Sequence, residues 1–414
     1  MPEEPEILLD RRGTAGIVTL NRPAALNAIT RAMVRTLREA LERWRHDGAV
    51  SRVILTAAGG RAFSAGGDLR HIYEAGRAGR QEESIAFWRE EYFLNAMIKH
   101  YPKPYVALID GIVMGGGVGV SVHGSHRIAG DRFAFAMPEV GIGFFPDVGA
   151  TWFLPRLPGE IGTYCALTGE RLKAADALAA GIATNRVASA RFAELVDALC
   201  GAVPVDTILA AFAEPASPSP LVGEGRGGGS GRCGNAVPAS PTPTPDPSPA
   251  EPRYSEDSAT QQSDRNRQEP ISVGGGGKKG GPVMAHRRAI DRIFAAGSVE
   301  EILARLDAEA ATASNDARWA GDVAATIRTK APLSLKIALA QMRRGRNWSF
   351  EECMRAEFRV VSRVAYGHDF YEGIRAVIID KDNRPRWHPP TLADAMAESV
   401  ERHFAPLRSE LALP

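Results

Sequence analysis

Two acidic residues in an apolar setting are the side chains best placed to do chemistry. Glu139 and Asp147 lie in the stretch MPEVGIGFFPDVG, among methionine, proline, glycine and phenylalanine residues. Acidic side chains are almost never buried without a partner or a task, and perturbed carboxyl groups concentrate at functional sites. The pair could supply a nucleophile or general base together with a proton donor.

Two glycine-rich loops could supply hydrogen-bond donors for the same chemistry. Residues 115–117 are a glycine triplet between an apolar run and a predicted short helix, and RAFSAGGDL at 61–69 places Gly67 just before another predicted helix start. Glycine lets the backbone approach a ligand closely, and a helix N-terminus points its N–H groups outward. Each loop alone is equally typical of a tight turn, but the N–H groups of Gly67 and Gly116 could together form an oxyanion hole. Donors and acids together predict an acyl-transfer site.

A dinucleotide-binding site and a metal site are the alternatives to an acyl-transfer site. Gly115, Gly117 and Gly119 resemble part of a dinucleotide-binding GxGxxG fingerprint, but the third glycine comes one position early and no acidic residue ends a second strand. His123 and His126 have a spacing that can bind a metal ion on a helix, but no third ligand is evident. We therefore expect structural histidines and no metal site.

Alternating strands and helices must position these loops. Apolar runs predict short strands at residues 16–20, 50–56 and 106–109, and helical spacing predicts helices at 30–45 and 81–100. Further helices are expected at 153–181, at 191–200 and after residue 286. This alternation predicts an α/β architecture with the loops gathered on one side.

The composition changes abruptly between about residues 215 and 282. This segment is rich in proline, glycine and serine and contains no phenylalanine or tryptophan. It cannot bury enough apolar surface to offset its ordering entropy, so we predict disorder, with an interdomain linker as the alternative. The predicted organisation is a core over 1–200, a mostly disordered insertion over 201–285, a helical part of the same fold over 286–395 and a C-terminal tail over 396–414.

Overall composition excludes several classes of protein. A chain of 414 residues with 44% hydrophobic and 24% charged residues is globular, and a net charge of +1 argues against nucleic acid or an anionic membrane as partner. No apolar run reaches the ~18 residues of a membrane span. The acidic first ten residues are unlike a signal peptide. A cytoplasmic location is expected, because no disulfide framework or zinc motif is formed by Cys165, Cys200, Cys233 and Cys353.

Three motifs resemble the enoyl-CoA hydratase/isomerase, or crotonase, superfamily: SAGGDL at 64–69, DGIVMGGGVG at 110–119 and FAMPEVGIGFFPDVG at 135–149. Within it, the third motif, REEYFLN at 89–95 and GHDFYEGIRAVIIDKD at 367–382 resemble the 3-hydroxyisobutyryl-CoA hydrolases of valine breakdown. The likeness covers about residues 5–200 and 286–395. It implies a spiral of repeated ββα units with a helical C-terminal portion.

The resemblance also implies a ligand and roles for individual residues. The ligand is an acyl-CoA thioester, so CoA is part of the substrate and no separate cofactor is expected; relatives often form trimers, which leaves a homo-oligomer open. The family's oxyanion donors correspond to the N–H groups of Gly67 and Gly116, and its catalytic acids correspond to Glu139 and Asp147. A further acid that contacts the substrate corresponds to Glu91. The CoA-binding loops contribute Ala25, Leu26, Ser64, Gly66 and Asp68.

Position 119 separates the two main enzyme activities. Hydratases of the superfamily carry a second glutamate three residues after the middle glycine of the triplet, and this chain has Gly119 there. Hydration needs a base and an acid on one water, whereas thioester hydrolysis needs an oxyanion hole, a nucleophile or base and a proton donor. The resemblance thus favours hydrolysis of a short 3-hydroxyacyl-CoA, such as 3-hydroxyisobutyryl-CoA, with Glu139 as nucleophile or base. A hydratase/isomerase and a non-catalytic CoA-ester-binding protein remain the alternatives.

Overall fold

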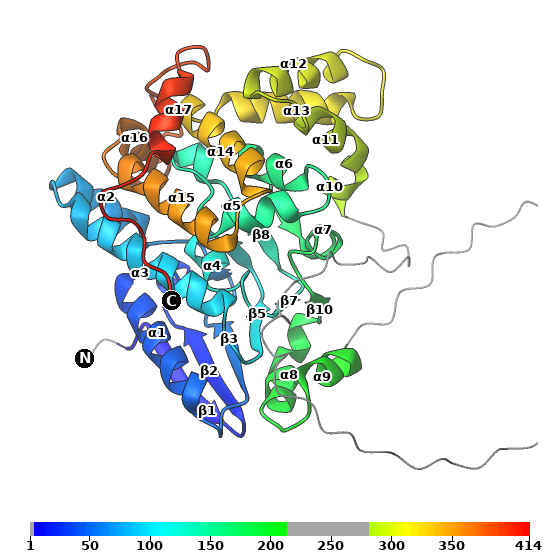
Figure 1. The fold of residues 1–414 in the computed structure, drawn as a ribbon. Coiled ribbons are helices and arrows are strands. Elements are labelled where there is room, and N and C mark those ends of the chain that lie inside the picture. The colour runs from blue at the N-terminus through cyan, green and yellow to red at the C-terminus, as the bar shows by residue number, and fades with distance from the viewer. Residues whose placement is uncertain (1–3, 213–280) are drawn as a thin grey trace, which may run out of the picture. The chain divides into compact units, whose positions relative to one another are not determined.

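Two β-sheets form the N-terminal part of the fold. The computed structural model describes residues 4–212 and 281–414 (Figure 1). Its strands are β1 (Ile7–Arg12), β2 (Ala15–Leu20), β3 (Arg52–Ala57), β4 (Ala62–Ser64), β5 (Tyr105–Ile109), β6 (Ile112–Met114), β7 (His126–Ala129), β8 (Ala134–Ala136), β9 (Leu172–Lys173) and β10 (Asn185–Arg186). A six-stranded sheet has the order β1-β2-β3-β5-β7-β10, and a four-stranded sheet has the order β4-β6-β8-β9. The pairs β1–β2 and β8–β9 are antiparallel, and the other pairs are parallel.

Successive strands alternate between the two sheets. Strands β3, β5 and β7 join the larger sheet, and β4, β6 and β8, which follow them directly in the chain, join the smaller one. Helix α1 (Arg31–His46) follows β1 and β2, helices α2 (Leu69–Arg77) and α3 (Gln81–Lys99) follow β3 and β4, and α4 (Gly116–Gly119) follows β5 and β6. The predicted α/β spiral of ββα units is therefore confirmed.

Helix α1 shows how local sequence sets these elements. Thr30 caps it, since its side chain accepts a hydrogen bond from the Met33 N–H at 3.2 Å. One face carries apolar side chains at helical spacing and is buried in the main core, and the helix ends on basic residues that suit its negative C-terminal dipole. The predicted helix over 30–45 is confirmed.

The stretch 153–181 is more broken than expected. It contains part of α5 (Ala150–Phe153), then α6 (Ile161–Thr168), the strand β9 and α7 (Ala174–Ala180). Gly169 ends α6 and Gly181 ends α7, both in the left-handed conformation that glycine adopts readily. Strand β9 exists only because Leu172 pairs with Phe135 of β8, a contact that local spacing cannot predict.

Ordered structure continues into the predicted insertion. After α8 (Phe192–Leu199), the helix α9 (Val205–Phe212) buries its apolar side chains in a second core cluster, with residues of β5 and β7. Helix α10 (Pro282–Ala285) precedes the C-terminal helices. The rest of the segment predicted to be disordered, residues 213–280, lies outside the described residues, and so does Cys233. The core therefore includes residues beyond 200, as far as Phe212 in the described part of the chain.

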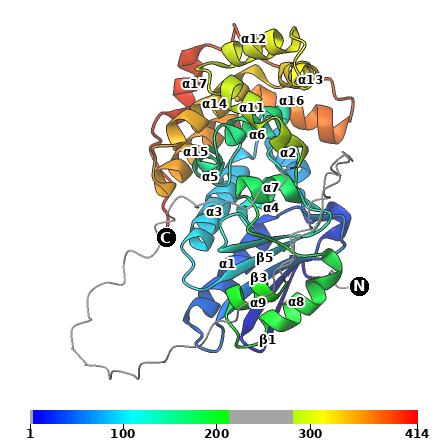
Figure 2. The ribbon, with the colours of Figure 1, turned by 90° about the vertical axis from the view of Figure 1, so that its right-hand side faces the viewer.

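Helices dominate the chain after residue 281. They are α11 (Arg287–Phe294), α12 (Val299–Ala310), α13 (Ala317–Arg328), α14 (Pro332–Gly345), α15 (Phe350–Val364), α16 (His368–Ile374), a π-helical turn (Arg375–Ile379) and α17 (Ala397–Phe404). Figures 1 and 2 show α14 and α15 lying against α5 and α3. Residues on both sides of 213–280 belong to one compact unit. No helix within residues 4–212 and 281–414 combines the length and the hydropathy that crossing a membrane requires.

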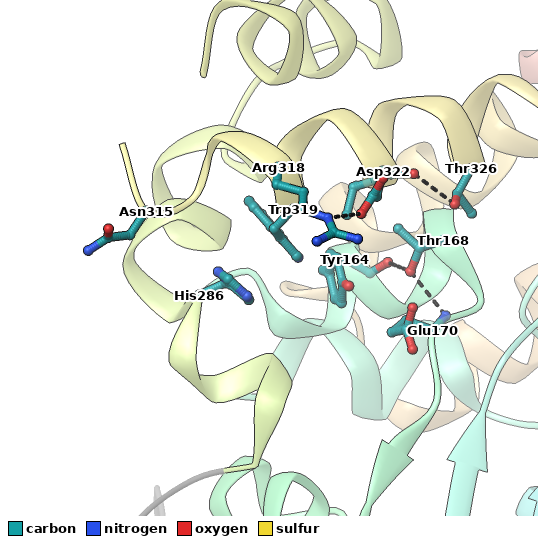
Figure 3. A pocket seen from close by; sticks show the side chains of 10 residues that line it. Tyr164, Thr168, Glu170, His286, Asn315, Arg318, Trp319, Asp322 and Thr326 are labelled. Carbon is teal, nitrogen blue, oxygen red and sulfur yellow. Dashed lines mark hydrogen bonds and ion pairs between the residues drawn. The ribbon is translucent and has the colours of Figure 1, made fainter. Parts of the chain in front are cut away.

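Helices α6 and α13, together with His286 directly before α11, border a pocket of about 430 Å³ (Figure 3). The His286 ring stacks on the Trp319 indole at a centroid distance of 4.8 Å, and its Nδ1 lies 2.7 Å from Asp316 Oδ1. Tyr164 of α6 lies on the other side of Trp319, with ring centroids 6.1 Å apart. Tyr164 thus packs α13 against α6, and it also contacts the Phe294 ring of α11, with centroids 5.3 Å apart.

The segment 396–414, predicted to be a tail, packs onto the fold. Leu411 is buried, and the Glu410 carboxylate accepts a hydrogen bond from Arg359 Nε at 2.9 Å and another from the Leu407 N–H. The Glu410 carbonyl accepts a hydrogen bond from Arg89 at 3.1 Å. Because Arg89 lies on α3 and Arg359 on α15, the C-terminus joins these two helices.

Glu410→Ala should therefore destabilise the fold by on the order of 1 kcal/mol, because it removes a charge-assisted hydrogen bond that is only partly exposed to solvent. Thermal melts at neutral pH would measure the change. Glu398→Ala is the matched control, since the Glu398 side chain is 88% exposed and its nearest Arg402 nitrogen is 3.7 Å away. Equal melting temperatures for the wild type and Glu410→Ala would contradict a stabilising role for the Glu410 carboxylate.

Candidate active site

A cavity of about 350 Å³ brings the predicted acids and glycine loops together. Its wall includes apolar side chains of α3 and the π-helical turn, among them Phe87, Trp88 and Val377. The predicted site residues that line it are Gly66, Gly67, Glu91, Gly116, Glu139 and Asp147. The cavity therefore contains both proposed oxyanion donors and every acid singled out in the sequence for catalysis or substrate contact.

The smaller sheet explains why these residues meet. Its parallel strands β4, β6 and β8 are neighbours, and their carboxyl ends lead to Gly67, Gly116 and Glu139, respectively. A Cβ atom added to Gly115 would lie 3.3 Å from Gly66 Cα, 3.7 Å from Glu139 Oε1 and 4.0 Å from the Gly67 nitrogen. Both glycine loops therefore face each other beside Glu139.

Gly116 is the first residue of α4, so its N–H precedes the first hydrogen bonds within that helix. A Cβ at this position would lie 2.6 Å from Glu91 Oε1 and 3.2 Å from Ile29 Cγ1. Only glycine thus fits between the cavity and these side chains, which leaves the backbone N–H close to any ligand.

Glu139 opens a 3₁₀ turn (Glu139–Ile142) and is 6% exposed. Its Oε2 atom accepts no hydrogen bond from the described part of the chain. Burial raises the pKa of Glu139 well above its usual range, and the nearby Asp147 carboxylate raises it further. A buried carboxyl oxygen without a partner, facing a cavity, is available to a substrate or a water molecule.

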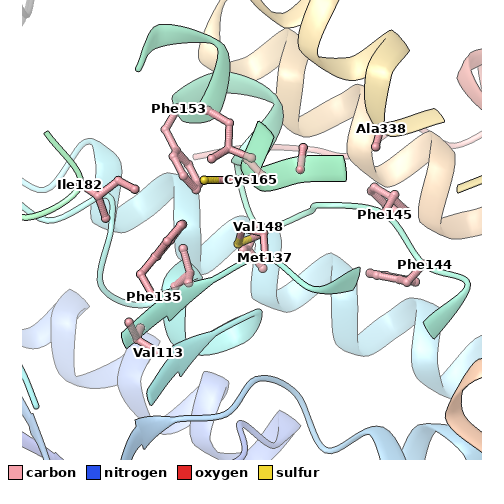
Figure 4. Packing of buried hydrophobic residues seen from close by; sticks show 14 of the residues in the cluster. Val113, Phe135, Met137, Phe144, Phe145, Val148, Phe153, Cys165, Ile182 and Ala338 are labelled. Atoms are coloured by element: carbon pink, nitrogen blue, oxygen red, sulfur yellow. The ribbon is translucent and has the colours of Figure 1, made fainter. Parts of the chain in front are cut away.

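Apolar packing around this turn supplies the low-dielectric surroundings. Figure 4 shows Met137, Phe144, Phe145 and Val148 pointing into the core on the segment that carries both acids. The Phe144 and Phe145 rings stack with centroids 4.6 Å apart. The charged forms of both carboxyls therefore lose solvation on folding.

Asp147 is also buried, but its carboxylate has a partner. The Tyr92 hydroxyl of α3 donates a hydrogen bond to Asp147 Oδ2 at 2.8 Å. Burial raises the pKa of Asp147 to about 7, and the hydrogen bond from Tyr92 opposes that rise. A carboxyl group with this pKa can exchange protons near neutral pH.

Tyr92→Phe should raise the pKa of Asp147, because the variant loses the donor that stabilises the carboxylate. A hydrogen bond of about 1 kcal/mol corresponds to a shift of up to about one pKa unit. In a profile of kcat/KM against pH, the limb that reports ionisation of Asp147 should move to higher pH. Tyr105→Phe is the control, since the buried Tyr105 hydroxyl bonds the Val120 carbonyl instead; an unchanged limb in Tyr92→Phe would contradict the assignment.

Glu91 adds a third acid from α3, four residues before Asn95 on the same helix. It is 2% exposed, and its Oε1 accepts no hydrogen bond from the described residues. Burial raises the pKa of Glu91, and the Asp147 charge adds to the rise. Since like charges at close range oppose each other's ionisation, the three carboxyls titrate as a coupled group.

The two predicted CoA-binding loops lie against each other. The Ala65 N–H donates to the Leu26 carbonyl at 3.0 Å, and the Asp68 carboxylate pairs with Arg22 at 3.1 Å. Ala25 is exposed at the edge of this arrangement, whereas Ser64 is fully buried and its Oγ accepts a long, 3.4 Å hydrogen bond from the Gly66 N–H. Of the residues in the two loops that were predicted to bind CoA, the cavity wall contains only Gly66.

The histidines singled out by spacing have other contacts. His123 Nε2 donates to the Val148 carbonyl at 2.7 Å, and burial lowers the pKa of His123 to about 3, so the ring is neutral. His126 lies on β7, with Nε2 3.0 Å from Asp206 Oδ1 and Nδ1 2.8 Å from Ser125 Oγ. The two rings therefore have separate hydrogen-bond partners.

Position 119 is closed to any side chain. A Cβ atom on Gly119 would lie 2.8 Å from Asn95 Nδ2 and 2.9 Å from Val148 Cβ. Neither polar atom of the fully buried Asn95 amide has a hydrogen-bond partner among the described residues. The space that an acidic side chain at 119 would need is thus occupied by Asn95 and Val148.

Sequence reasoning missed two residues that contact the Asp147 loop from the C-terminal helices. Glu357 of α15 and Gln341 of α14 are buried and bond the backbone around Asp147. A signal for Glu357 was present, because this acid lies on the apolar face of a predicted helix, at helical spacing from Met354 and Val361. Gln341 gave no comparable signal.

Comparisons with known proteins agree with this architecture. Residues 15–224 and 255–404 match the model of a family described as enoyl-CoA hydratase/isomerase. The mitochondrial 3-hydroxyisobutyryl-CoA hydrolase of Danio rerio is 40% identical over 97% of this chain and 90% of its own length, and that of Homo sapiens is 38% identical over 98% and 89%. The expectation of a cytoplasmic location for this chain stays a prediction.

Two solved structures cover the chain almost completely. A carnitinyl-CoA dehydratase from Mycobacterium thermoresistibile has a TM-score of 0.78 and 37% identity, with 99% of each chain covered. An enoyl-CoA hydratase from Rhodobacter sphaeroides has a TM-score of 0.76 and 34% identity, covering 99% of this chain and 100% of its own. The fold is therefore shared with proteins named for more than one reaction.

Proposed function

The chain belongs to the enoyl-CoA hydratase/isomerase family of CoA-thioester enzymes, and from this premise we propose that it hydrolyses a short 3-hydroxyacyl-CoA, namely 3-hydroxyisobutyryl-CoA, to 3-hydroxyisobutyrate and CoA. This is a step of valine breakdown. The observation that carries the proposal is a buried Glu139, whose Oε2 has no partner among the described residues, beside Gly67 and Gly116, combined with a position 119 that admits no second acid. Relatives named as such hydrolases support the choice of substrate.

In the proposed reaction, the thioester carbonyl oxygen accepts hydrogen bonds from the N–H groups of Gly67 and Gly116. These donors stabilise the negative charge that develops when the carbonyl carbon is attacked. Glu139 either attacks the carbonyl carbon to form an acyl-enzyme anhydride, which water then opens, or removes a proton from the attacking water. Either route adds one water across the C–S bond.

In this reaction, Asp147 acts as the proton donor and acceptor. With its pKa raised to about 7, Asp147 can deliver a proton to the leaving CoA sulfur and regain one from water. Glu91 faces the same cavity, its Oε1 has no partner in residues 4–212 and 281–414, and it is proposed to bind the hydroxyl group of the acyl chain. A free hydroxyl would satisfy that buried oxygen, which favours hydroxyacyl over plain acyl substrates.

Hydration of an enoyl-CoA is the competing activity, given the names of the two solved structures. It would need a second acid on the attacking water, and the packing of Asn95 and Val148 against Gly119 leaves no room for one at that position. Gly119→Glu is consequently expected to disrupt packing instead of creating a hydratase. Hydratase and hydrolase activity are therefore best distinguished in the wild-type protein.

Release of free CoA from 3-hydroxyisobutyryl-CoA, crotonyl-CoA and acetyl-CoA, measured with a thiol reagent, tests the proposal. We expect CoA release to be fastest from 3-hydroxyisobutyryl-CoA. Hydration of the crotonyl-CoA double bond should be negligible by comparison. Rapid hydration of crotonyl-CoA would contradict the proposed hydrolysis and identify the protein as a hydratase. Tight binding of all three esters without turnover would instead indicate a CoA-ester-binding protein.

A further inference from the structure

The loop that carries Asp147 has a backbone conformation that its residues disfavour. Val148 has a φ of +53°, in the left-handed region, where β-branched residues are genuine outliers. Gly149 follows at φ +90°, and a Cβ there would lie 2.5 Å from His123 Cε1. Such strain persists only where surrounding groups impose it, and it concentrates at functional sites.

Glu357 is the first of these groups. It lies on α15, is fully buried, and is 208 residues from Gly149 in the sequence. Its Oε2 accepts a hydrogen bond from the Gly149 N–H at 2.7 Å, and its Oε1 accepts one from the Thr151 N–H at 2.8 Å. Two short bonds to one carboxyl group fix both the position and the orientation of the backbone directly after Asp147.

Gln341 of α14 holds the other side of the loop. Its Nε2 donates to the Pro146 carbonyl, directly before Asp147, at 3.0 Å and to Thr151 Oγ1 at 2.7 Å. His123 donates to the Val148 carbonyl between them at 2.7 Å. The backbone is therefore held before, at and after the strained residue.

We propose that Glu357 and Gln341 are positioning residues, which hold the Asp147 loop in its left-handed turn so that the Asp147 carboxylate meets Tyr92 at the wall of the cavity. The proposal rests on the proposed hydrolysis for its effect on turnover, but its effect on the loop is independent of any activity. Neither residue lines the cavity, so neither touches the substrate. Helices encoded after residue 281 thus complete a site whose proposed catalytic and oxyanion residues all precede it.

Two variants remove these contacts. Glu357→Gln keeps the shape but turns one acceptor into an NH₂ group that faces a backbone N–H, and Gln341→Met keeps the volume but removes both donated bonds. Misplacing a catalytic group by about 1 Å can lower the rate by ~10²-fold. We expect kcat to fall by about 10- to 100-fold on the thioester that the wild type cleaves fastest, with KM within about twofold. Loss of folded protein would also lower the apparent kcat at an unchanged KM, so kcat is expressed per folded protein, with the folded fraction measured by a thermal melt of the same preparation.

Hydrogen exchange measured by mass spectrometry gives the readout that needs no turnover. Peptides covering residues 146–153 should exchange faster in both variants, because the Gly149 and Thr151 N–H groups lose their acceptor or its support. Glu352→Gln is the matched control: Glu352 lies on the same helix, but it is exposed and its carboxylate accepts the hydrogen bond of the Ser349 N–H at the helix start. It should leave exchange at 146–153 and kcat unchanged.

The outcomes separate this proposal from the proposed function. Wild-type exchange at 146–153 together with wild-type kcat in both variants would overturn the positioning role. If the wild type cleaves none of the thioesters, the proposed hydrolysis fails, and the exchange measurement alone decides whether the two residues hold the loop. If Glu357→Gln does not fold, the same criteria apply to Gln341→Met, which changes no charge.

Discussion

Glu139→Gln is expected to lower the rate of thioester hydrolysis by about 10²–10⁴-fold, the usual contribution of a general base, or by more if Glu139 forms a covalent intermediate. The substitution keeps size and shape but removes the charge and the proton affinity of the buried carboxyl group. Binding of the thioester should persist, because Gly67, Gly116 and Glu91 are unchanged. Turnover and thioester affinity would be measured on the same preparation.

The melting temperature of Glu139→Gln distinguishes a catalytic acid from a structural one. Burial raises the pKa of Glu139 well above its usual range, so its charged form is destabilised in the folded protein. A neutral replacement should leave stability at pH 8 unchanged or higher, as is common where activity and stability oppose each other. A folded Glu139→Gln protein with intact binding and near-normal hydrolysis would remove Glu139 from the mechanism.

Asp147→Asn is expected to lower kcat by about 10²–10⁴-fold as well, because an amide cannot pass a proton to the leaving sulfur. The amide oxygen of the substituted side chain could still accept the hydrogen bond from Tyr92, so the loop should remain in place. The wild-type profile should show a group with a pKa of about 7, and this group should be missing from the residual activity of the variant. Retention of the same limb in Asp147→Asn would assign it to another residue.

Stability against pH gives a second, independent result for Asp147→Asn. The pKa of Asp147 is raised in the folded state to about 7 from 3.8. The folded protein therefore holds a proton that the unfolded chain lacks, and the resulting stabilisation is present below pH 3.8 and is lost as pH rises through about 7. Each pKa unit corresponds to about 1.4 kcal/mol, so the variant should gain stability relative to wild type, by on the order of 1 kcal/mol or more, between pH 4 and pH 8.

Thermal melts of both proteins at pH 5 and pH 8 would measure this difference. The carboxyl groups of Glu91, Glu139 and Glu357 remain in the variant and also have raised pKa values, so its stability should still fall with pH, but less steeply than that of the wild type. Parallel pH dependences in the two proteins would mean that Asp147 ionises normally and is not the buried acid described above.

The local sequence was sufficient to predict the α/β class and to single out Gly67, Gly116, Glu139 and Asp147, which line the cavity; Gly66 and Glu91 came from the family resemblance. Glycine-rich loops directly after apolar runs indicate turns at strand ends, and parallel neighbouring strands bring such turns to one edge of a sheet. Glu139 was conspicuous because an acid between methionine, proline and two phenylalanines has no ordinary surface role. The catalytic roles assigned to these residues stay predictions, whereas their meeting in one cavity is a property of the fold.

Tertiary structure alone decided what surrounds those residues. No spacing rule could pair Leu172 with Phe135 to form β9, place Asn95 and Val148 against Gly119, or bury Ser64 against Gly117, because each depends on chain segments brought together by packing. The contacts of Glu357 and Gln341 with the Asp147 loop span 208 and 195 residues, respectively. Sequence spacing reports which side chains share a helix face or a strand end, but only the packed helices determine which backbone groups a buried side chain reaches.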